Sequence, residues 1–184
     1  ALLGAEVVRV DAVDVVAAQL TLARGCSDTV PASHAAGTAL LVYEDRGAVD
    51  PTEYLAGTTM LAKLLTRTGA GVLAEAAAPP VALTMGGRAE RPYPPGDLRL
   101  AGLRYPATVT AVTIVVAWQH RDRLLQADQL VDTLHGDIGP EPGTTYAWRL
   151  QAMPAETLVA GGAGQVGTGL TLAAQPSGQI GRAH

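Results

Sequence analysis

Short apolar runs, separated by residues that form turns, make up most of this 184-residue chain. Apolar and polar positions alternate loosely over 6–16 and again over 19–23, which predicts two strands, with Leu20 and Leu22 of the second facing a core. Short apolar segments bounded by glycine or proline are also typical of strands. In the N-terminal half, strands are therefore predicted over 6–16, 19–23, 38–44, 58–68, 72–78 and 80–85.

The run over 58–68 fits two interpretations. Leu61, Leu64 and Leu65 have the spacing of one helical face. The threonines at both ends of the run and the glycines that flank it favour a strand instead. We predict a strand.

A segment rich in glycine and proline, 86–96, divides the chain. Its composition is typical of a semi-rigid, extended linker. We therefore predict a β-rich domain over 1–90, a linker over 91–96 and a second, sandwich-like β domain over 97–184. The fold class expected for the whole chain is mainly β.

The second domain is predicted to have a central strand over 109–118, whose unbroken apolar middle indicates burial on both sides. Residues 124–135 have helical spacing, and a short helix and an irregular loop both remain open. The other strands are predicted over 97–103, 144–150, 157–160 and 169–173, with a glycine-rich hairpin between the last two.

A charged corner follows the central strand. Arg121 and Arg123 alternate with Asp122, so their guanidinium groups are expected to share a face. They are predicted to hold Asp137 or Glu141, in the proline- and glycine-rich connection that comes next, through paired hydrogen bonds to a carboxylate.

Aromatic residues mark the two strands on either side of that connection. The first ends at Trp118, and the second carries Tyr146 and Trp148 on one face. Two such strands joined by a long polar connection predict a β-sandwich with Trp118 as its anchor.

Several strings, taken in order, resemble one protein family. W-Q-H-R-D-R over 118–123, followed by G-D-I-G-P-E-P-G-T-T-Y over 136–146, resembles a module near the C-terminal end of phage tail-tip and central-hub proteins, which also occur in prophages and gene transfer agents. The segments 20–37 and 88–92 resemble those that precede this module, and the module itself resembles a fibronectin type III domain. The matching residues, expected to be structural, are Arg24, Gly25, Asp28, Thr29, His34, Gly37, Arg91, Pro92, Trp118, Arg121, Arg123, Gly139, Glu141 and Tyr146.

This resemblance implies a structural, non-enzymatic segment of a tail tip, which positions receptor-contacting parts during host attachment. It implies a location in the virion after synthesis in the bacterial host cytoplasm. The implied partners are other tail-tip subunits, further copies of the chain in a homo-oligomer, and a host surface receptor or glycan. The alternative is a spacer or carbohydrate-binding module of a bacterial surface or secreted adhesin. The chain departs from the family at Cys26, where an aliphatic residue is expected.

The amino-acid composition excludes several classes of protein function and structure. The chain is 48% hydrophobic but only 4% aromatic, so its core is expected to consist of Val, Leu and Ala. The net charge of −4 does not indicate the positively charged surface that nucleic-acid-binding proteins use. Apolar stretches are too short or too interrupted to span a bilayer. Cys26 is the single cysteine, so an intrachain disulfide is excluded.

Three motifs suggest catalysis or cofactor binding, but each lacks the context that its chemistry needs. G-x-G-x-x-G over 162–167 precedes strand-like residues, whereas dinucleotide binding requires a helix there. H-R-D over 120–122 lacks the rest of a kinase signature. Ser27, Asp28 and His34 lack a nucleophile elbow and an oxyanion hole. We expect no catalytic or cofactor-binding residue.

Metal binding is not expected either. Asp128, Asp132, Asp137 and Glu141 supply the oxygen ligands that calcium prefers, but their spacing matches no compact calcium loop. A solvated acidic rim is the expected arrangement. His34 and His135 each lack a second histidine at the spacing of zinc ligands.

The last residues, 180–184, resemble the translation of a sequencing adapter, which favours a metagenomic fragment of a longer protein. The resemblance also implies that the module continues for one or two more strands, so the domain over 97–184 is expected to be incomplete at its C-terminal end. A sandwich that lacks strands exposes an edge and half of a core. We therefore predict that the isolated chain aggregates or dimerises.

Overall fold

The computed structural model describes residues 1–44 and 50–173. Within them the chain is mainly β, as the sequence predicted, and consists of antiparallel sheets with two short 3-10 helices. In chain order the elements are β1 (Leu2–Leu3), β2 (Glu6–Val7), β3 (Arg9–Asp14), β4 (Gln19–Ala23), β5 (Leu40–Leu41), β6 (Thr59–Lys63), β7 (Arg67–Thr68), β8 (Gly71–Val72), η1 (Glu75–Ala77), β9 (Pro80–Thr84), η2 (Arg88–Glu90), β10 (Gly96–Leu100), β11 (Leu103–Arg104), β12 (Ile114–Gln119), β13 (Tyr146–Ala152), β14 (Thr157–Gln165) and β15 (Gly169–Leu172).

The chain divides into two compact units. The first combines Ala1–Glu44 with Pro92–His184, and the second is Asp45–Arg91. This division differs from the two consecutive domains that the sequence predicted, although one boundary falls within the predicted linker. The N-terminal segment belongs with the C-terminal part because buried hydrogen bonds join them, such as the one from Arg121 to the carbonyl of Gly25.

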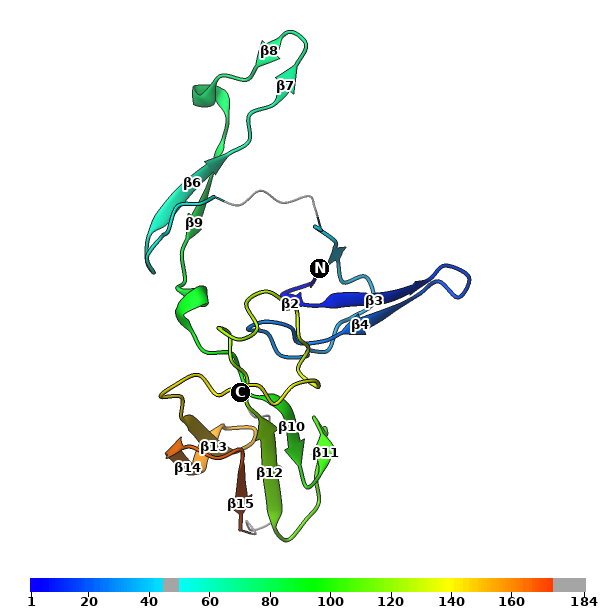
Figure 1. Ribbon diagram of the computed structural model, residues 1–184, viewed down its shortest axis with the longest axis vertical. Helices are drawn as coiled ribbons and strands as arrows, with labels where there is room; N and C mark the ends of the chain where they lie inside the picture. The colour runs from blue at the N-terminus through cyan, green and yellow to red at the C-terminus, as the bar shows by residue number, and fades with distance from the viewer. Residues whose placement is uncertain (45–49, 174–184) are drawn as a thin grey trace. The chain divides into compact units, whose positions relative to one another are not determined.

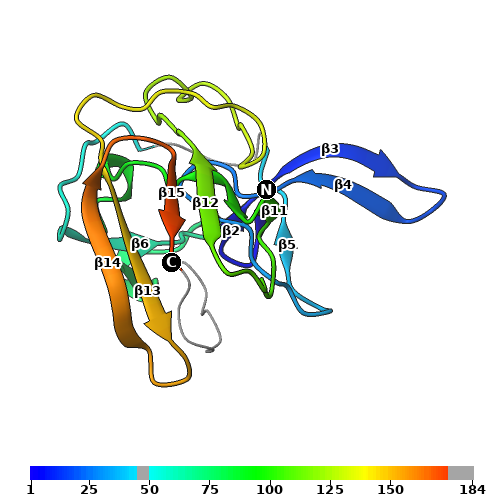
Figure 2. The same cartoon turned by 90° about the horizontal axis from the view of Figure 1, so that it is seen from below.

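In its described residues, the first unit consists of two larger sheets and two separate ribbons (Figures 1 and 2). One sheet has the order β2-β1-β5 and the other β11-β10-β12-β15, while β3 pairs with β4 and β13 with β14. The β13–β14 ribbon contacts the four-stranded sheet through Tyr146 on β13 and Trp118 on β12. Their ring centroids lie 5.2 Å apart at an interplanar angle of 69°. Trp118 therefore joins two sheets, and the fibronectin type III topology stays a prediction.

A small apolar core lies between β2, β4 and the loop that follows β4. Val7, Ala23 and Cys26 are buried together, and Leu2 and Leu130 pack against them. Burial raises the pKa of the Cys26 thiol, so at neutral pH the side chain is a small apolar group.

The β3–β4 ribbon confirms two predicted strands but not their burial. β4 has the predicted bounds, whereas the strand over 6–16 is divided at Val8 into β2 and β3. Leu20 is 45% exposed, so its predicted place in a core is wrong. The reason is that β3 and β4 form a two-stranded sheet of their own. The strand predicted over 38–44 is reduced to β5, two residues long.

The central strand is buried on one face only. Ile114 and Trp118 of β12 are buried, but Val115 is 51% exposed. The predicted burial on both faces is therefore wrong. The neighbours of β12, β10 and β15, pair with its edges through the backbone, and this pairing does not bury the side chain of Val115.

The glycine-rich segment that the sequence assigned to a hairpin is part of a long strand. Gly161 and Gly162 of β14 pair with Arg149 and Trp148 of β13. The cross-strand pairing overrides the weak strand preference of glycine. β15 pairs with β12 instead of β14, so the predicted hairpin between these two late strands is wrong.

Residues 124–135 are irregular, which settles the two alternatives in favour of the loop. Aspartates compete with helix formation here by accepting hydrogen bonds from nearby backbone groups. Asp122 accepts hydrogen bonds from the N–H groups of Leu124 and Leu125. In the same way, Asp132 accepts from the N–H groups of Leu134 and His135.

The second unit is a ribbon of β6 and β9, continued by the short β7–β8 hairpin (Figure 1). The predicted strands over 58–68 and 80–85 are confirmed, the first with a break between β6 and β7. The strand predicted over 72–78 is wrong beyond its first residue, because the alanine-rich stretch forms η1. Among the described residues of this unit, Ala78 alone is buried.

Candidate functional site

A cluster of charged groups and backbone donors in the first unit surrounds the carboxylate of Glu6, which is only 3% exposed. Arg24 donates two hydrogen bonds to it, one from Nε to Oε1 and one from Nη2 to Oε2, each 2.7 Å long. The backbone N–H groups of Gly25 and Ala32 donate at 2.8 and 3.1 Å. His34 Nε2 lies 2.8 Å from Oε2. We call this set the Glu6 network.

The Glu6 network holds the carboxylate in its charged form. Burial alone would raise the pKa of Glu6, but the hydrogen bonds from Arg24, His34, Ala32 and Gly25 outweigh burial. They lower the pKa from 4.5 to about 2. A carboxylate that remains ionised and is surrounded by donors cannot serve as a general acid or base near neutral pH. The network is therefore suited to holding β2 and the 24–34 loop together.

This pKa predicts how stability depends on pH. Because the folded-state pKa of Glu6 lies below 4.5, the network stabilises the fold fully above about pH 4.5 and loses that contribution as the pH falls towards 2. The difference corresponds to about 3 kcal/mol. Denaturant unfolding measured across this range should show a steep loss, which Glu6→Gln reduces. Glu75→Gln, a change on a carboxylate that is 76% exposed, should leave the profile as it is. Equal slopes in all three proteins would contradict this assignment.

The glycine and threonine of the R-G-x-x-D-T string have separate roles beside the network. Gly25 has a φ of +59°, and a Cβ there would lie 2.7 Å from the Pro31 ring, so a side chain does not fit. Thr29 Oγ1 donates to the carbonyl of Cys26 at 2.7 Å and accepts from the Val7 N–H at 3.1 Å. The string therefore forms a loop closed onto β2.

Arg121 joins this loop to the C-terminal part of the chain. Its side chain is buried and donates to the carbonyls of Gly25, Ser27 and Val131 at 3.0, 3.1 and 3.2 Å. The guanidinium also lies over the ring of Tyr93, 5.3 Å from its centroid. Burial lowers the pKa of Arg121. The predicted grip of Arg121 on a carboxylate is wrong, because backbone carbonyls take its hydrogen bonds.

Backbone hydrogen bonds around Thr133 add to this connection. Its N–H donates to the carbonyl of Arg24 at 3.0 Å, and its own carbonyl accepts from the Asp97 N–H at 2.7 Å. Its hydroxyl lies 2.9 Å from that of Tyr105. Three segments that are distant in sequence therefore meet at the buried side chain of Arg121.

The other arginine of the charged corner behaves as predicted. Arg123 donates to Glu141 from its backbone N–H and from Nε, each at 3.1 Å. Asp137 accepts from the backbone N–H of His120 at 2.7 Å. Gly139 has a φ of +102°, and a Cβ there would lie 2.7 Å from Cβ of Asp122. These contacts fix the proline- and glycine-rich connection against the end of β12.

The structure also places the remaining residues of the family-like strings. Gly37 has a φ of +86°, with open space where a side chain would be. Arg91 belongs to the second unit and donates to the carbonyl of Gly86 at 2.5 Å, whereas Pro92 begins the C-terminal part of the first unit. Asp28 lies in the loop after β4 and is half-buried.

The described residues hold no group of three His, Cys, Asp or Glu side chains that is arranged for a metal ion. Two of the acidic residues considered for calcium, Asp132 and Asp137, accept backbone hydrogen bonds instead, from Leu134 and His120. The catalytic arrangement considered for Ser27, Asp28 and His34 does not form, since His34 is directed to Glu6.

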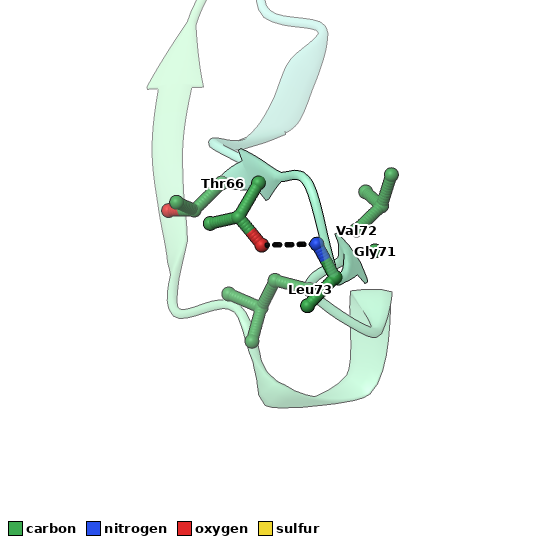
Figure 3. Close-up of a pocket in the computed structure, with 6 residues that line it drawn as sticks. Thr66, Gly71, Val72 and Leu73 are labelled. Carbon is green, nitrogen blue, oxygen red and sulfur yellow. Dashed lines mark hydrogen bonds between the residues drawn. The ribbon is translucent and has the colours of Figure 1, made fainter.

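The second unit has a hollow at the β7–β8 hairpin (Figure 3). The carbonyl of Thr66 and the N–H of Leu73 form a 2.9 Å hydrogen bond across it. None of the lining side chains is ionisable, so the hollow offers no acid, base or charged anchor for a ligand. It is lined by Thr66, Thr68, Ala70, Gly71, Val72 and Leu73.

Sequence reasoning identified Arg24, Gly25 and His34 but missed Glu6, the group on which they converge. A glutamate in an apolar strand context, Glu6-Val7-Val8, was the available signal, since a buried carboxylate requires a cationic partner. Nothing in the local pattern indicates that the partner follows 18 residues later.

Comparison with known proteins adds no family assignment. Neither a protein-family model nor a curated protein matches this chain. In the part of the chain that the structure describes, no helix has the length and apolar character needed to cross a membrane.

Proposed function

We propose that this chain is a non-enzymatic structural segment of a phage tail tip or hub, where it positions receptor-contacting parts during host attachment. One observation carries the proposal: the two family-like strings contact each other. Arg121 of W-Q-H-R-D-R donates to the carbonyls of Gly25 and Ser27 in R-G-C-S-D-T, across 96 and 94 residues of sequence. Their shared, buried contact gives a physical reason for both strings to occur in one protein.

The proposed work is mechanical. The Glu6 network and the Arg121 contacts restrict the movement of long loops, because charged side chains form hydrogen bonds with the loop backbone. Loops fixed in this way keep the two sheets of the first unit in a constant geometry. A segment with constant geometry transmits position from a conserved hub to parts that contact a receptor.

The proposed location is the virion tail tip, after synthesis in the bacterial host cytoplasm. The proposed partners are other tail-tip subunits, further copies of this chain, and a host receptor or glycan reached through neighbouring parts. These assignments rest on the resemblance of the strings over 20–37 and 118–146.

A long sequencing read across the gene and its neighbours tests the proposal. We expect adjacent tail-assembly genes and a reading frame that continues well beyond Gln179. Immunogold labelling of particles from the same host, with an antibody against the chain, should then mark the distal end of the tail. A signal peptide upstream with a surface anchor downstream, and label on the bacterial surface, would overturn the proposal in favour of an adhesin.

A further inference from the structure

Two arginines and one aspartate form a charged group on the four-stranded sheet of the first unit. Asp97 of β10 is 3% exposed. Arg99 donates to its Oδ2 from Nε and from Nη2, at 2.8 and 2.6 Å. Nε of Arg104, on β11, lies 2.7 Å from its Oδ1. Within the four strands of this sheet, Asp97 is the only acidic residue and the two arginines are the only basic ones, so the group carries an excess of positive charge. The two arginines are here called the Arg99–Arg104 pair.

The burial of Asp97 does not account for both arginines. One guanidinium can pair with a carboxylate through two hydrogen bonds, and Arg99 already donates two. Arg104 stands directly opposite Arg99 where β10 pairs with β11. Like charges in such positions destabilise a sheet. The second guanidinium therefore has a cost that the neutralisation of Asp97 does not explain.

The backbone at Asp97 fixes the orientation of the pair. Asp97 has a φ of +42°, which is uncommon for a residue with a side chain, and the register of β10 against β12 shifts at this point. Bulges of this kind change the direction of side chains, and residues in sparsely populated conformations cluster at functional sites. The N–H of Asp97 donates to the carbonyl of Thr133 at 2.7 Å, which holds the bulge in place.

This orientation leaves several donors of the pair without a partner. Each arginine turns its Nε towards Asp97. Nη1 of Arg99 and both Nη atoms of Arg104 then have no hydrogen-bond acceptor among the described residues. The two side chains are 38% and 49% exposed, so these donors can be reached from the solvent.

The face of the sheet beside the pair is open. One row across β11, β10, β12 and β15 consists of Arg104, Arg99, Ala117 and Gly169 (Figure 1). Residues that stand opposite each other share a face, so the two arginines lie next to two residues with little or no side chain. Val115, two residues before Ala117 on the same face, is 51% exposed. A ligand held by the arginines can therefore lie across this face.

We propose that the Arg99–Arg104 pair binds an oxyanion, the phosphate or carboxylate group of an acidic sugar. Guanidinium donors match two oxygen atoms of either group, and the excess positive charge favours an anion. The sugar ring lies over Ala117 and Gly169, where no large side chain occupies the space. The choice of a sugar rests on the glycan of the proposed function and gives this chain a direct contact with it, whereas the anion site rests on the geometry of the pair.

NMR titration of the full, isotope-labelled chain tests the site. Inorganic phosphate, glucose 6-phosphate and glucuronate should each shift the amide signals of β10 and β11, with dissociation constants of about 1–10 mM, because a few solvent-exposed hydrogen bonds hold the anion. Neutral glucose should cause no shift. Arg104→Gln should weaken the binding of all three anions at least about tenfold. Arg149→Gln, on an exposed arginine of β13, is the matched control and should leave binding unchanged.

A second variant covers the case in which Arg104→Gln does not fold. Arg104→Lys keeps a positive charge beside Asp97 but presents one ammonium in place of the guanidinium, so it should weaken binding by about three- to tenfold. Its amide spectrum shows whether the fold is retained. An absence of binding by the unaltered chain, or an affinity that neither Arg104 variant lowers, would overturn the site. Binding of inorganic phosphate without either acidic sugar would overturn the choice of a sugar. These results leave the gene-neighbourhood and labelling tests of the tail role unaffected.

Discussion

Replacing Arg121 with methionine should lower the free energy of unfolding of the first unit by about 3–5 kcal/mol. Methionine fills much of the same volume but donates no hydrogen bond. The carbonyls of Gly25, Ser27 and Val131 would then lose the donor that they share inside the protein. Equilibrium denaturation followed by tryptophan fluorescence measures the change, because Trp118 and Trp148 both lie in the first unit.

Two further variants separate geometry from charge. Arg121→Lys keeps the charge but presents a single ammonium, which cannot reach three carbonyls with the spread of a guanidinium, so an intermediate loss is expected. Arg149→Met is the matched control on an exposed arginine of β13, and it should change stability by less than about 1 kcal/mol. If Arg121→Met is as stable as the Arg149 variant, Arg121 does not hold the two strings together.

The mainly β fold was predictable from local sequence. Alternation gave β4 its bounds, and flanking glycines and threonines separated strand from helix over 58–68. The hydrogen bonds from Arg123 to Glu141 were also predictable from local sequence. Both partners lie close to one turn-rich connection, and the chain has little freedom to place them elsewhere.

Contacts that depend on distant partners were not predictable. Alternating residues in β3 and β4 indicated a core, yet Leu20 remains exposed because no local signal tells how many sheets will stack. The glycines of β14 pair with β13 through cross-strand contacts that their own propensity opposes. Arg121 donates to backbone carbonyls. Every residue has a carbonyl, so residue types alone cannot identify which ones accept from Arg121.

The charged groups of the two family-like strings therefore act differently from their surface counterparts. Surface ion pairs such as Lys63 with Glu75 contribute little to stability. In the pair that joins β2 to the loop after β4, the Glu6 side chain is 2% exposed and the Arg24 side chain 35% exposed. Removal of Arg24 therefore leaves a buried carboxylate without its main partner, which is costly.

Replacing Glu6 with alanine should be as damaging as the loss of Arg121, at about 3–5 kcal/mol at neutral pH. The substitution removes the acceptor for Arg24, His34 and two backbone N–H groups together. The N–H of Gly25 is the most costly to leave without a partner, since it is buried and the loop geometry prevents it from turning to water.

The combination of Glu6→Ala with Arg24→Ala tests whether the two residues act as one unit. If the carboxylate and the guanidinium stabilise the fold mainly through each other, the double variant should lose clearly less than the sum of the two single losses, by about 1–3 kcal/mol. Asp11→Ala is the control, because Asp11 pairs with Arg9 where both side chains are at least 36% exposed. It should cost less than about 1 kcal/mol. Strictly additive losses of stability at Glu6 and Arg24 would contradict this coupling. They would show that the backbone donors alone compensate for the burial of the Glu6 carboxylate. Arg24 would then stabilise the fold through another contact, such as its 2.7 Å hydrogen bond to the carbonyl of Ala32.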